Sequence, residues 1–388
     1  MRFLFFLLLC TQITYSQNQL QAVLLDSTTK APIEFADVYN HYNYTTSNAD
    51  GSFMFTSSGD SVFIKYLGYK PIRTTFNELQ NKKIIFLAEE TVVLDAVVLT
   101  GKNDIYSQLA KSIENNYPFF PYEERFTLRA FLKKNDTVLK LQDLTGKLKR
   151  KQLFATQKHP MPRKNYEVEL LNMRKAGLKE ENVEFMLGDF TKILNWFILH
   201  APLENDKYDV KSGAINDTVD MVEFTVKDSI VNAIHSNNSG YLKINSDNKA
   251  ILENHLVIRR DSVDYEKSGP YKYRTTHMEV NAFYEKATNR KYFLKNAKVE
   301  VLVAVVNIKT AKKDIYNCTY IITTHDNFKN LNTQKNASVK KDIFRLKYPY
   351  NPDFWEKQNQ LLLTNEMLDF LSTVNAKDNE YRAISNLK

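Results

Sequence analysis

The feature that most constrains the fold is a repeated alternation of apolar and polar residues, which turn residues interrupt at short intervals. Between Leu20 and Leu99, short apolar runs end at Asp, Gly, Pro or clusters of Ser and Thr. Successive side chains of a strand point to opposite faces, and the interruptions come too soon for long helices. We therefore predict about seven short strands in residues 17–100, arranged as an all-β sandwich.

The stretch from Thr45 to Phe55, TTSNADGSFMF, is open to two interpretations, a calcium loop and a turn. A calcium loop of the EF-hand type needs oxygen ligands at alternate positions and a bidentate Glu at the twelfth. With Gly51 as the sixth residue, the first and twelfth positions are Thr46 and Ser57, and neither is a carboxylate. Asp-Gly before alternating apolar residues is a hairpin signal, because Gly adopts positive φ without steric cost. We interpret the run as a turn.

The periodicity changes after Gly101. Ile105, Leu109 and Ile113 fall on one face of a helix that must stop before Pro118. Residues 101–124 are thus predicted to be a connector helix followed by an aromatic segment that contains proline. The aromatic residues of this segment are Tyr117, Phe119, Phe120 and Tyr122. They either line a binding cleft or form an apolar seal between two domains, and we expect a seal that packs mainly on the C-terminal domain.

Residues 125–388 predict an α+β domain with a large antiparallel sheet and a few helices, in which the sheet curves around a helix. The alternating runs that predict long strands are residues 219–228, 239–258, 277–285, 290–308 and 317–327. A basic stretch and residues 170–199 predict helices, residues 247–249 predict a turn, and residues 349–371 predict a loop followed by an amphipathic helix.

The first sixteen residues have the form of a secretory signal peptide. Arg2 precedes an apolar run, and cleavage after Ser16 would leave Gln17 as the first residue of the mature chain. The alternative is a lipoprotein signal that uses Cys10, which the bulky Leu8 and Leu9 disfavour. Cleavage leaves Cys318 as the single cysteine, so we expect no internal disulfide.

Three stretches of the first hundred residues resemble the carboxypeptidase-like regulatory domain of Bacteroidota envelope proteins, which precedes TonB-dependent receptors. The matching positions are Pro32, Ile33, Ala36 and Val38; Ser47, Asn48, Gly51 and Phe53; and Gly68 and Tyr69. The ending Leu94 to Gly101, in which Ala96 stands where Glu is usual, is similar to the segment that follows this domain in TonB-dependent receptors. The resemblance implies a transthyretin-like sandwich without activity of its own. Residues 113–136 resemble the connector of larger proteins of this group, and residues 240–251 resemble, more loosely, their second domain.

The charge of the chain does not favour nucleic-acid binding. Its formal net charge is +8, but basic residues are scattered among acidic ones, as on a solvated surface. After the signal, no apolar run is long enough for a membrane span.

A search for catalytic motifs predicts no catalytic, cofactor-binding or metal-binding residue. Zinc peptidases use a His-x-x-Glu motif, which is absent, and His277 with Glu279 on one face of a strand supplies only two ligands. Neither a Gly-x-Ser-x-Gly elbow nor a glycine-rich phosphate loop occurs. Cys318 is expected to be a buried thiol, and Glu123 with Glu124 a solvated pair.

These observations predict a non-enzymatic, exported cell-envelope protein whose second domain binds an envelope protein or a small envelope ligand. We expect it to be periplasmic or associated with the outer membrane, and soluble after signal cleavage. One alternative is a lipid or lipoprotein carrier that uses a curved sheet. Another is an unrecognised hydrolase of glycans or peptides.

Overall fold

The computed structural model describes residues 18–90, 102–156, 158–177, 188–197, 207–260, 263–325, 330–356 and 362–374. The predicted cleavage site at Ser16 and Gln17, the alternative lipid site at Cys10 and the expected strand at residues 94–99 lie outside these ranges. The chain divides into two compact units, residues 1–91 with 357–368 and residues 92–356 with 369–388. We call them the N-terminal unit and the large-sheet unit.

The N-terminal unit contains two small sheets around one core. The first has the strand order β4 (Ser52–Ser57), β1 (Asn18–Asp26) and β7 (Ile84–Leu87), and the second β3 (Tyr44–Thr46), β2 (Asp37–Tyr39), β5 (Ser61–Lys65) and β6 (Ile72–Thr75). A short helix, α1 (Phe76–Leu79), follows β6. Alternate residues of β1 and β4 are buried and join one hydrophobic core, as the period of two predicts.

Asp50 and Gly51 form the predicted turn. Gly51 has φ of 73°, and a Cβ atom there would lie 2.3 Å from the carbonyl oxygen of Leu24. The side chain of Asn48 accepts hydrogen bonds from the backbone N–H groups of Asp50 and Ser52. The same Asn48 donates to the carbonyl oxygen of Leu363, and the Asp50 carboxylate accepts from the Asn365 N–H at 2.7 Å. These polar side chains therefore fix the turn and hold residues 362–365 against it.

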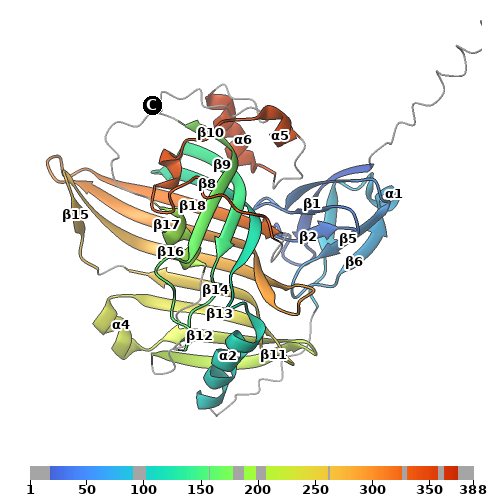
Figure 1. Cartoon of the computed structure of the whole chain (residues 1–388), viewed down its shortest axis with the longest axis horizontal. Coiled ribbons are helices and arrows are strands. Elements are labelled where there is room, and N and C mark those ends of the chain that lie inside the picture. The colour runs from blue at the N-terminus through green and yellow to red at the C-terminus, as the bar shows by residue number, and fades with distance from the viewer. Residues whose placement is uncertain are drawn as a thin grey trace, which may run out of the picture. The chain divides into compact units, whose positions relative to one another are not determined.

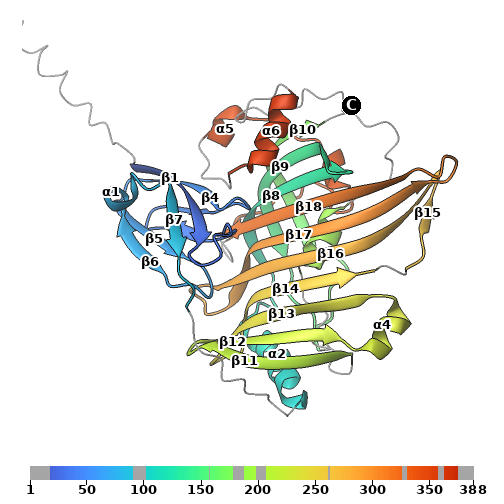
Figure 2. The same ribbon diagram turned by 180° about the vertical axis from the view of Figure 1, so that it is seen from behind.

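The large-sheet unit is built on an antiparallel sheet of eleven strands. Their order is β10 (Tyr166–Gly177), β9 (Thr137–Arg150), β8 (Tyr122–Lys134), β18 (Lys313–His325), β17 (Tyr292–Asn307), β16 (Tyr271–Lys286), β14 (Ile251–Arg259), β13 (Asn237–Asn245), β12 (Val219–Val226) and β11 (Tyr208–Asn216), with β15 (Glu266–Ser268) paired to β16. Figures 1 and 2 show that the sheet curves strongly.

Few helices accompany this sheet. They are α2 (Lys102–Asn116), α3 (Phe190–Trp196), α4 (Asp228–Ile234), the 3₁₀ helix η3 (Ile343–Arg345), α5 (Pro352–Glu356) and α6 (Asn365–Thr373), whose residues belong to both units. The predicted helix after Gly101 is confirmed as α2, which ends before Pro118 and buries Leu109 and Ile113. The strands predicted from residue 219 onwards are confirmed as β12, β13, β14, β16, β17 and β18.

The helix predictions for the basic stretch and for the start of residues 170–199 are wrong. The basic run at residues 147–150 lies in β9, and residues 170–177 belong to β10. A β-bulge lies between Leu170 and Asn172, and beyond it Met173 and Arg174 are both buried although they point to opposite faces, so residues 170–177 lack the alternation that reveals a strand. One amphipathic helix was predicted at the C-terminal end. The described residues there form two short helices instead, α5 and α6.

Candidate functional site

The face of the large sheet that α2 and α3 cover is called the inner face, and the opposite face the outer face. Cross-strand partners share a face, and on the inner face Val280 of β16 pairs with Leu256 and Val299. These side chains belong to the same hydrophobic core as Ile113 of α2 and Phe190 of α3. The inner face thus forms the main core of the unit.

One end of the inner face, which we call the closed end, is filled by aromatic rings. They are Tyr117, Tyr122, Phe154, Tyr284 and Tyr292. The ring of Tyr117 is fully buried and meets the ring of Phe154 edge-on, with centroids 4.5 Å apart. Its hydroxyl donates a hydrogen bond of 2.5 Å to the carbonyl oxygen of Ile251. This aromatic cluster closes the end where β14 begins and β16 stops.

A buried ion pair lies within the closed end. Arg150 Nε lies 2.6 Å from Glu124 Oε1, and the two side chains are 1% and 0% exposed. Burial raises the pKa of Glu124 although Arg150 is beside it. Burial, the largest single influence, would lower the pKa of Arg150, but Glu124, Tyr122 and Tyr166 together outweigh it and the pKa is raised. The expectation that Glu123 and Glu124 form a solvated pair is therefore wrong for Glu124.

The opposite end of the inner face, the open end, is only partly covered. On β16 the inner-face residues Val280, Ala282 and Tyr284 are buried, whereas Met278, Tyr273 and Tyr271 are partly exposed. Contacts of α2 and α3 with the sheet explain the difference, because they fall on the closed end. Ser112 bonds to the Lys249 carbonyl, and Tyr284 bonds to the carbonyl of Phe197, which caps α3.

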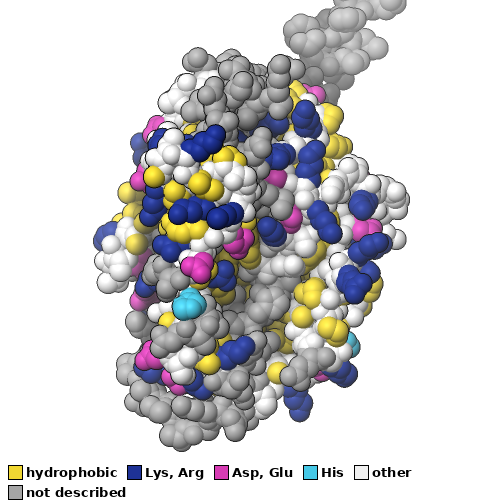
Figure 3. Space-filling view, turned by 90° about the vertical axis from the view of Figure 1, so that its left-hand side faces the viewer, with side chains coloured by type: hydrophobic (Ala, Val, Ile, Leu, Met, Phe, Trp, Pro, Cys, Tyr) yellow, Lys and Arg dark blue, Asp and Glu magenta, His cyan; other side chains and the backbone are white. Residues whose placement is uncertain are grey.

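The side chains of the open end are mainly apolar. The partly buried ones are Ile258 of β14, Tyr271, Tyr273 and Met278 of β16, and Ile230 and Val231 of α4. From Tyr271 to Met278, β16 extends about 20 Å. Figure 3 views the molecule from the side on which this end lies. A partly exposed apolar surface of this kind is a candidate binding surface.

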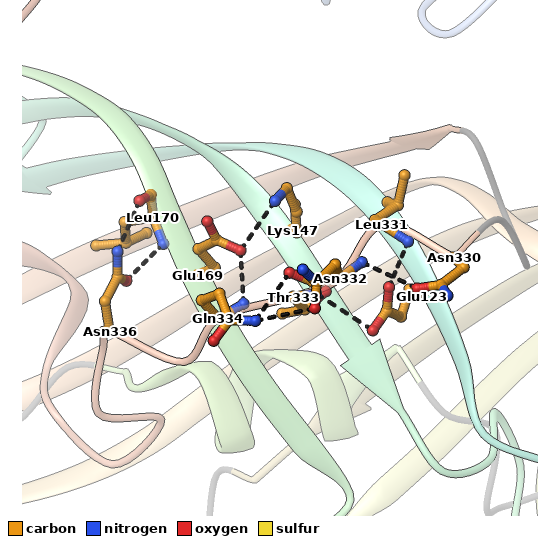
Figure 4. A network of polar contacts seen from close by, with 10 residues as sticks. All are labelled: Glu123, Lys147, Glu169, Leu170, Asn330, Leu331, Asn332, Thr333, Gln334 and Asn336. Carbon is orange, nitrogen blue, oxygen red and sulfur yellow. Dashed lines mark hydrogen bonds and ion pairs between the residues drawn. The ribbon is translucent and has the colours of Figure 1, made fainter.

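On the outer face, residues 330–336 cross the strands β8, β9 and β10 (Figure 4). The Glu123 carboxylate accepts hydrogen bonds from the backbone of Leu331 and Thr333. The Glu169 carboxylate accepts from the Gln334 N–H at 2.7 Å and pairs with Lys147. Ala337 then forms a bridge with Val168 in β10. The segment covers part of an edge strand, which reduces its tendency to pair with another chain.

His277 and Glu279 lie on one face of β16, as predicted, with Nε2 and Oε2 3.7 Å apart. The neighbouring strand adds His255, whose Nε2 lies 3.8 Å from the same carboxylate and whose Nδ1 contacts Asn281 Oδ1 at 2.7 Å. Sequence reasoning missed His255, because only the register of β14 with β16 brings it there. Among the described residues, no group of three or more His, Cys, Asp or Glu could hold a metal ion. We interpret this outer-face group as surface polar contacts.

The remaining predicted residues fall in the core or on its surface. Cys318 is buried on the inner face, and burial raises the pKa of its thiol, which agrees with the expected buried thiol. Of the aromatic segment, Tyr117 and Tyr122 are buried and the Phe119 ring contacts the His159 ring, but Phe120 is 41% exposed. The expectation that all four rings form a seal is wrong for Phe120. In the described part of the chain, no helix has both the length and the apolar character to cross a membrane.

Three solved structures resemble this chain with low TM-scores. No family model and no curated protein matches the chain. A LolA superfamily protein from Nitrosomonas europaea is 11% identical, and the match covers 61% of this chain and 97% of that protein. A Vibrio parahaemolyticus domain assigned to outer membrane lipoprotein sorting is 9% identical, and the match covers 62% of this chain and 95% of that domain. Lipovitellin is 12% identical, over 66% of this chain and 31% of its own. All three TM-scores are 0.25, which is too low to establish a shared fold.

Proposed function

We propose that the chain is a non-enzymatic, exported envelope protein that carries a lipid, or the acyl part of a lipoprotein, on the open end of its large sheet. The observation that carries this proposal is the change in burial along one strand. The inner face of β16 is buried at Val280 and Ala282 and partly exposed from Met278 to Tyr271. An acyl chain laid along this apolar stretch would remove it from water, which is the main driving force for binding of this kind.

The chemistry of the open end favours an apolar ligand over a reaction. Its described polar groups on β16 are the hydroxyls of Thr275, Tyr271 and Tyr273, and the Tyr273 hydroxyl donates to Glu266. Such groups can orient the polar end of a ligand, as the few polar groups of small-molecule sites do. Of the hypotheses drawn from the sequence, the lipid or lipoprotein carrier therefore fits this surface best. A partner-binding protein without a lipid, as the sequence favours, is the second candidate.

The other parts of the proposal come from the sequence. We propose that residues 1–16 are a signal peptide, that the mature chain is periplasmic or associated with the outer membrane, and that residues 17–100 are a carboxypeptidase-like regulatory domain with a transthyretin-like fold. The solved structure described as a lipoprotein-sorting domain names the same kind of cargo as the carrier hypothesis, but its TM-score of 0.25 adds no support.

The experiment compares two neighbouring residues that point to opposite faces of β14. Ile258 lies on the inner face opposite Met278, and Val257 lies on the outer face opposite Glu279, and both are partly exposed. Ile258→Lys places a charge on the proposed acyl surface, whereas Val257→Lys adds the same charge elsewhere. We expect Ile258→Lys to weaken binding of the fluorescent fatty acid cis-parinaric acid at least about tenfold, because an unpaired charge against an acyl chain is costly.

Val257→Lys should bind the fatty acid as the unmodified protein does. Native mass spectrometry of the gently extracted protein should also find a bound lipid that is absent from the Ile258→Lys protein. Equal binding by both variants, or a protein that neither retains lipid nor binds the probe, would contradict the carrier proposal and favour the partner-binding candidate. Turnover of a broad panel of glycans and peptides would instead establish the hydrolase alternative.

A further inference from the structure

Three turns of the large sheet lie together at one end and form a surface that the proposed carriage of a lipid does not explain. The turn after β8 bonds to β18 through Asn135 N–H and the Ile315 carbonyl, at 2.8 Å. The turn before β16 is joined to the turn after β17 by the Ile308 N–H and the Pro270 carbonyl, at 2.9 Å. We call residues 133–137, 264–274 and 307–314 the hairpin tip.

The hairpin tip is strongly basic. It contains eight basic and four acidic side chains: Lys133, Lys134, Lys267, Lys272, Arg274, Lys309, Lys312 and Lys313 against Asp136, Asp264, Glu266 and Asp314. The excess of four positive charges is half of the formal net charge of +8 of the whole chain. Lys267, Lys309, Lys312 and Lys313 are exposed. Such a concentration of charge attracts an anionic partner.

The same surface carries apolar and aromatic side chains. Ile308, at the turn, is 49% exposed and is surrounded in the sequence by Asn307 and Lys309. Tyr265 is partly exposed, with Lys272 Nζ 5.3 Å and Arg274 Cζ 4.7 Å from its ring centre. Viewed from this side, Lys and Arg side chains gather around hydrophobic ones (Figure 3).

We propose that the hairpin tip docks on the surface of an anionic lipid bilayer. Lysines attract anionic headgroups, aromatic side chains sit at the level of the headgroups, and an exposed aliphatic residue reaches the acyl boundary. The tip combines all three: the exposed lysines, Tyr265 with Tyr271, and Ile308. A purely polar anionic partner would leave Ile308 without a contact, and an apolar protein partner would leave the excess positive charge unmatched.

The hairpin tip lies next to the surface on which we propose that the lipid binds. Tyr271 and Tyr273 belong both to the hairpin tip and to the open end of the inner face. A bilayer against the tip would therefore lie next to the surface on which an acyl chain is proposed to bind. This step rests on the proposed function, whereas the docking itself depends only on the charge and the exposed apolar residues of the tip.

The test is co-sedimentation of the full mature chain with vesicles of phosphatidylcholine that contain phosphatidylglycerol, and with vesicles of phosphatidylcholine alone. We expect binding to the anionic vesicles that weakens as salt is added. The triple variant Lys309→Glu, Lys312→Glu, Lys313→Glu should bind them at least about tenfold more weakly. A matched triple variant in the N-terminal unit, Lys65→Glu, Lys82→Glu, Lys83→Glu, changes three exposed lysines and should bind as before.

A second variant, Ile308→Ser, keeps every charge and should weaken vesicle binding several-fold, while circular dichroism confirms that each variant is folded. Absence of binding to anionic vesicles, or equal loss in the two triple variants, would overturn docking through the tip. Cis-parinaric acid binding distinguishes this proposal from the proposed function. Tip variants that keep the fatty acid but lose the vesicles support docking, and Ile258→Lys should lose the fatty acid but keep the vesicles.

Discussion

The closed end and the open end of the inner face both contain tyrosines, which are buried at the first and partly exposed at the second. At the closed end, Tyr117 and Tyr284 are buried and their hydroxyls donate to backbone carbonyl oxygens. At the open end, Tyr271 and Tyr273 stand on the same face of β16 as Tyr284 but are partly exposed. A single strand of sixteen residues thus runs from a packed core to a partly exposed surface. Its residues can stabilise the fold at one end and remain available to a ligand at the other.

The difference between the two ends indicates which residues stabilise the fold and which are available to bind a ligand. Packing of α2 and α3 on the closed end buries apolar area and satisfies hydroxyl groups, and both effects stabilise the folded state. The partly exposed residues of the open end stabilise the fold less, because folding removes less of their surface from water. We therefore expect substitutions at the closed end to change unfolding, and substitutions at the open end to change binding.

The largest expected effect is the loss of Tyr117. Tyr117→Ala should lower the free energy of unfolding of the large-sheet unit by roughly 4 kcal/mol, because it leaves a cavity among buried rings. Tyr273→Ala, at the open end, should lower it by less than about 1 kcal/mol. Urea denaturation followed by circular dichroism measures both. Similar losses for the two variants would mean that the open end is packed as tightly as the closed end.

The next largest expected effect is the loss of stability when the buried ion pair of the closed end is broken, and it depends on pH. Arg150→Met leaves Glu124 buried without its cation and should cost about 3 kcal/mol near pH 8. The pKa of Glu124 is raised above its unfolded value of about 4.5, so the folded state loses stability as pH rises from that value towards the raised pKa. Removing Arg150 strengthens this trend, and the cost should therefore be smaller near pH 5.

The control for this prediction is the double variant Glu124→Gln, Arg150→Met. It removes both charges, so it should recover most of the lost stability and show little dependence on pH between 5 and 8. A single variant whose cost is the same at the two pH values would show that Glu124 is not the titrating group. The measurement is urea denaturation at each pH.

Local sequence signals predicted the parts of the fold that depend on neighbouring residues. Asp50-Gly51 forms a turn because Gly adopts positive φ, and Ile105, Leu109 and Ile113 lie on one helical face because the helix repeats every 3.6 residues. In the long strands from residue 219 onwards, apolar and polar residues alternate, and this alternation was visible in the sequence.

Long-range pairing decides what the sequence could not reveal. β10 was mistaken for a helix because Arg174 is buried by pairing with Asp143 and by contact with Trp355, both distant in sequence. Glu124 was taken as solvated because Arg150 reaches it only through the pairing of β8 with β9. The open end was equally invisible, since the exposure of Met278 depends on where α2 and α3 stop covering the sheet.

The smallest expected effect concerns Phe120, whose ring is the exposed one among the described rings of the aromatic segment. The sequence favours a buried Phe120, whose loss would cost about 3 kcal/mol. Its side chain is 41% exposed, while Tyr122, two residues later, is 4% exposed at the start of β8. Phe120→Ala should therefore change the free energy of unfolding by less than about 1 kcal/mol, and Tyr122→Ala by several times as much. Urea denaturation of the two variants compares them directly. A loss near 3 kcal/mol for Phe120→Ala would show that the ring is covered in solution, and the closed end would then extend to the whole segment.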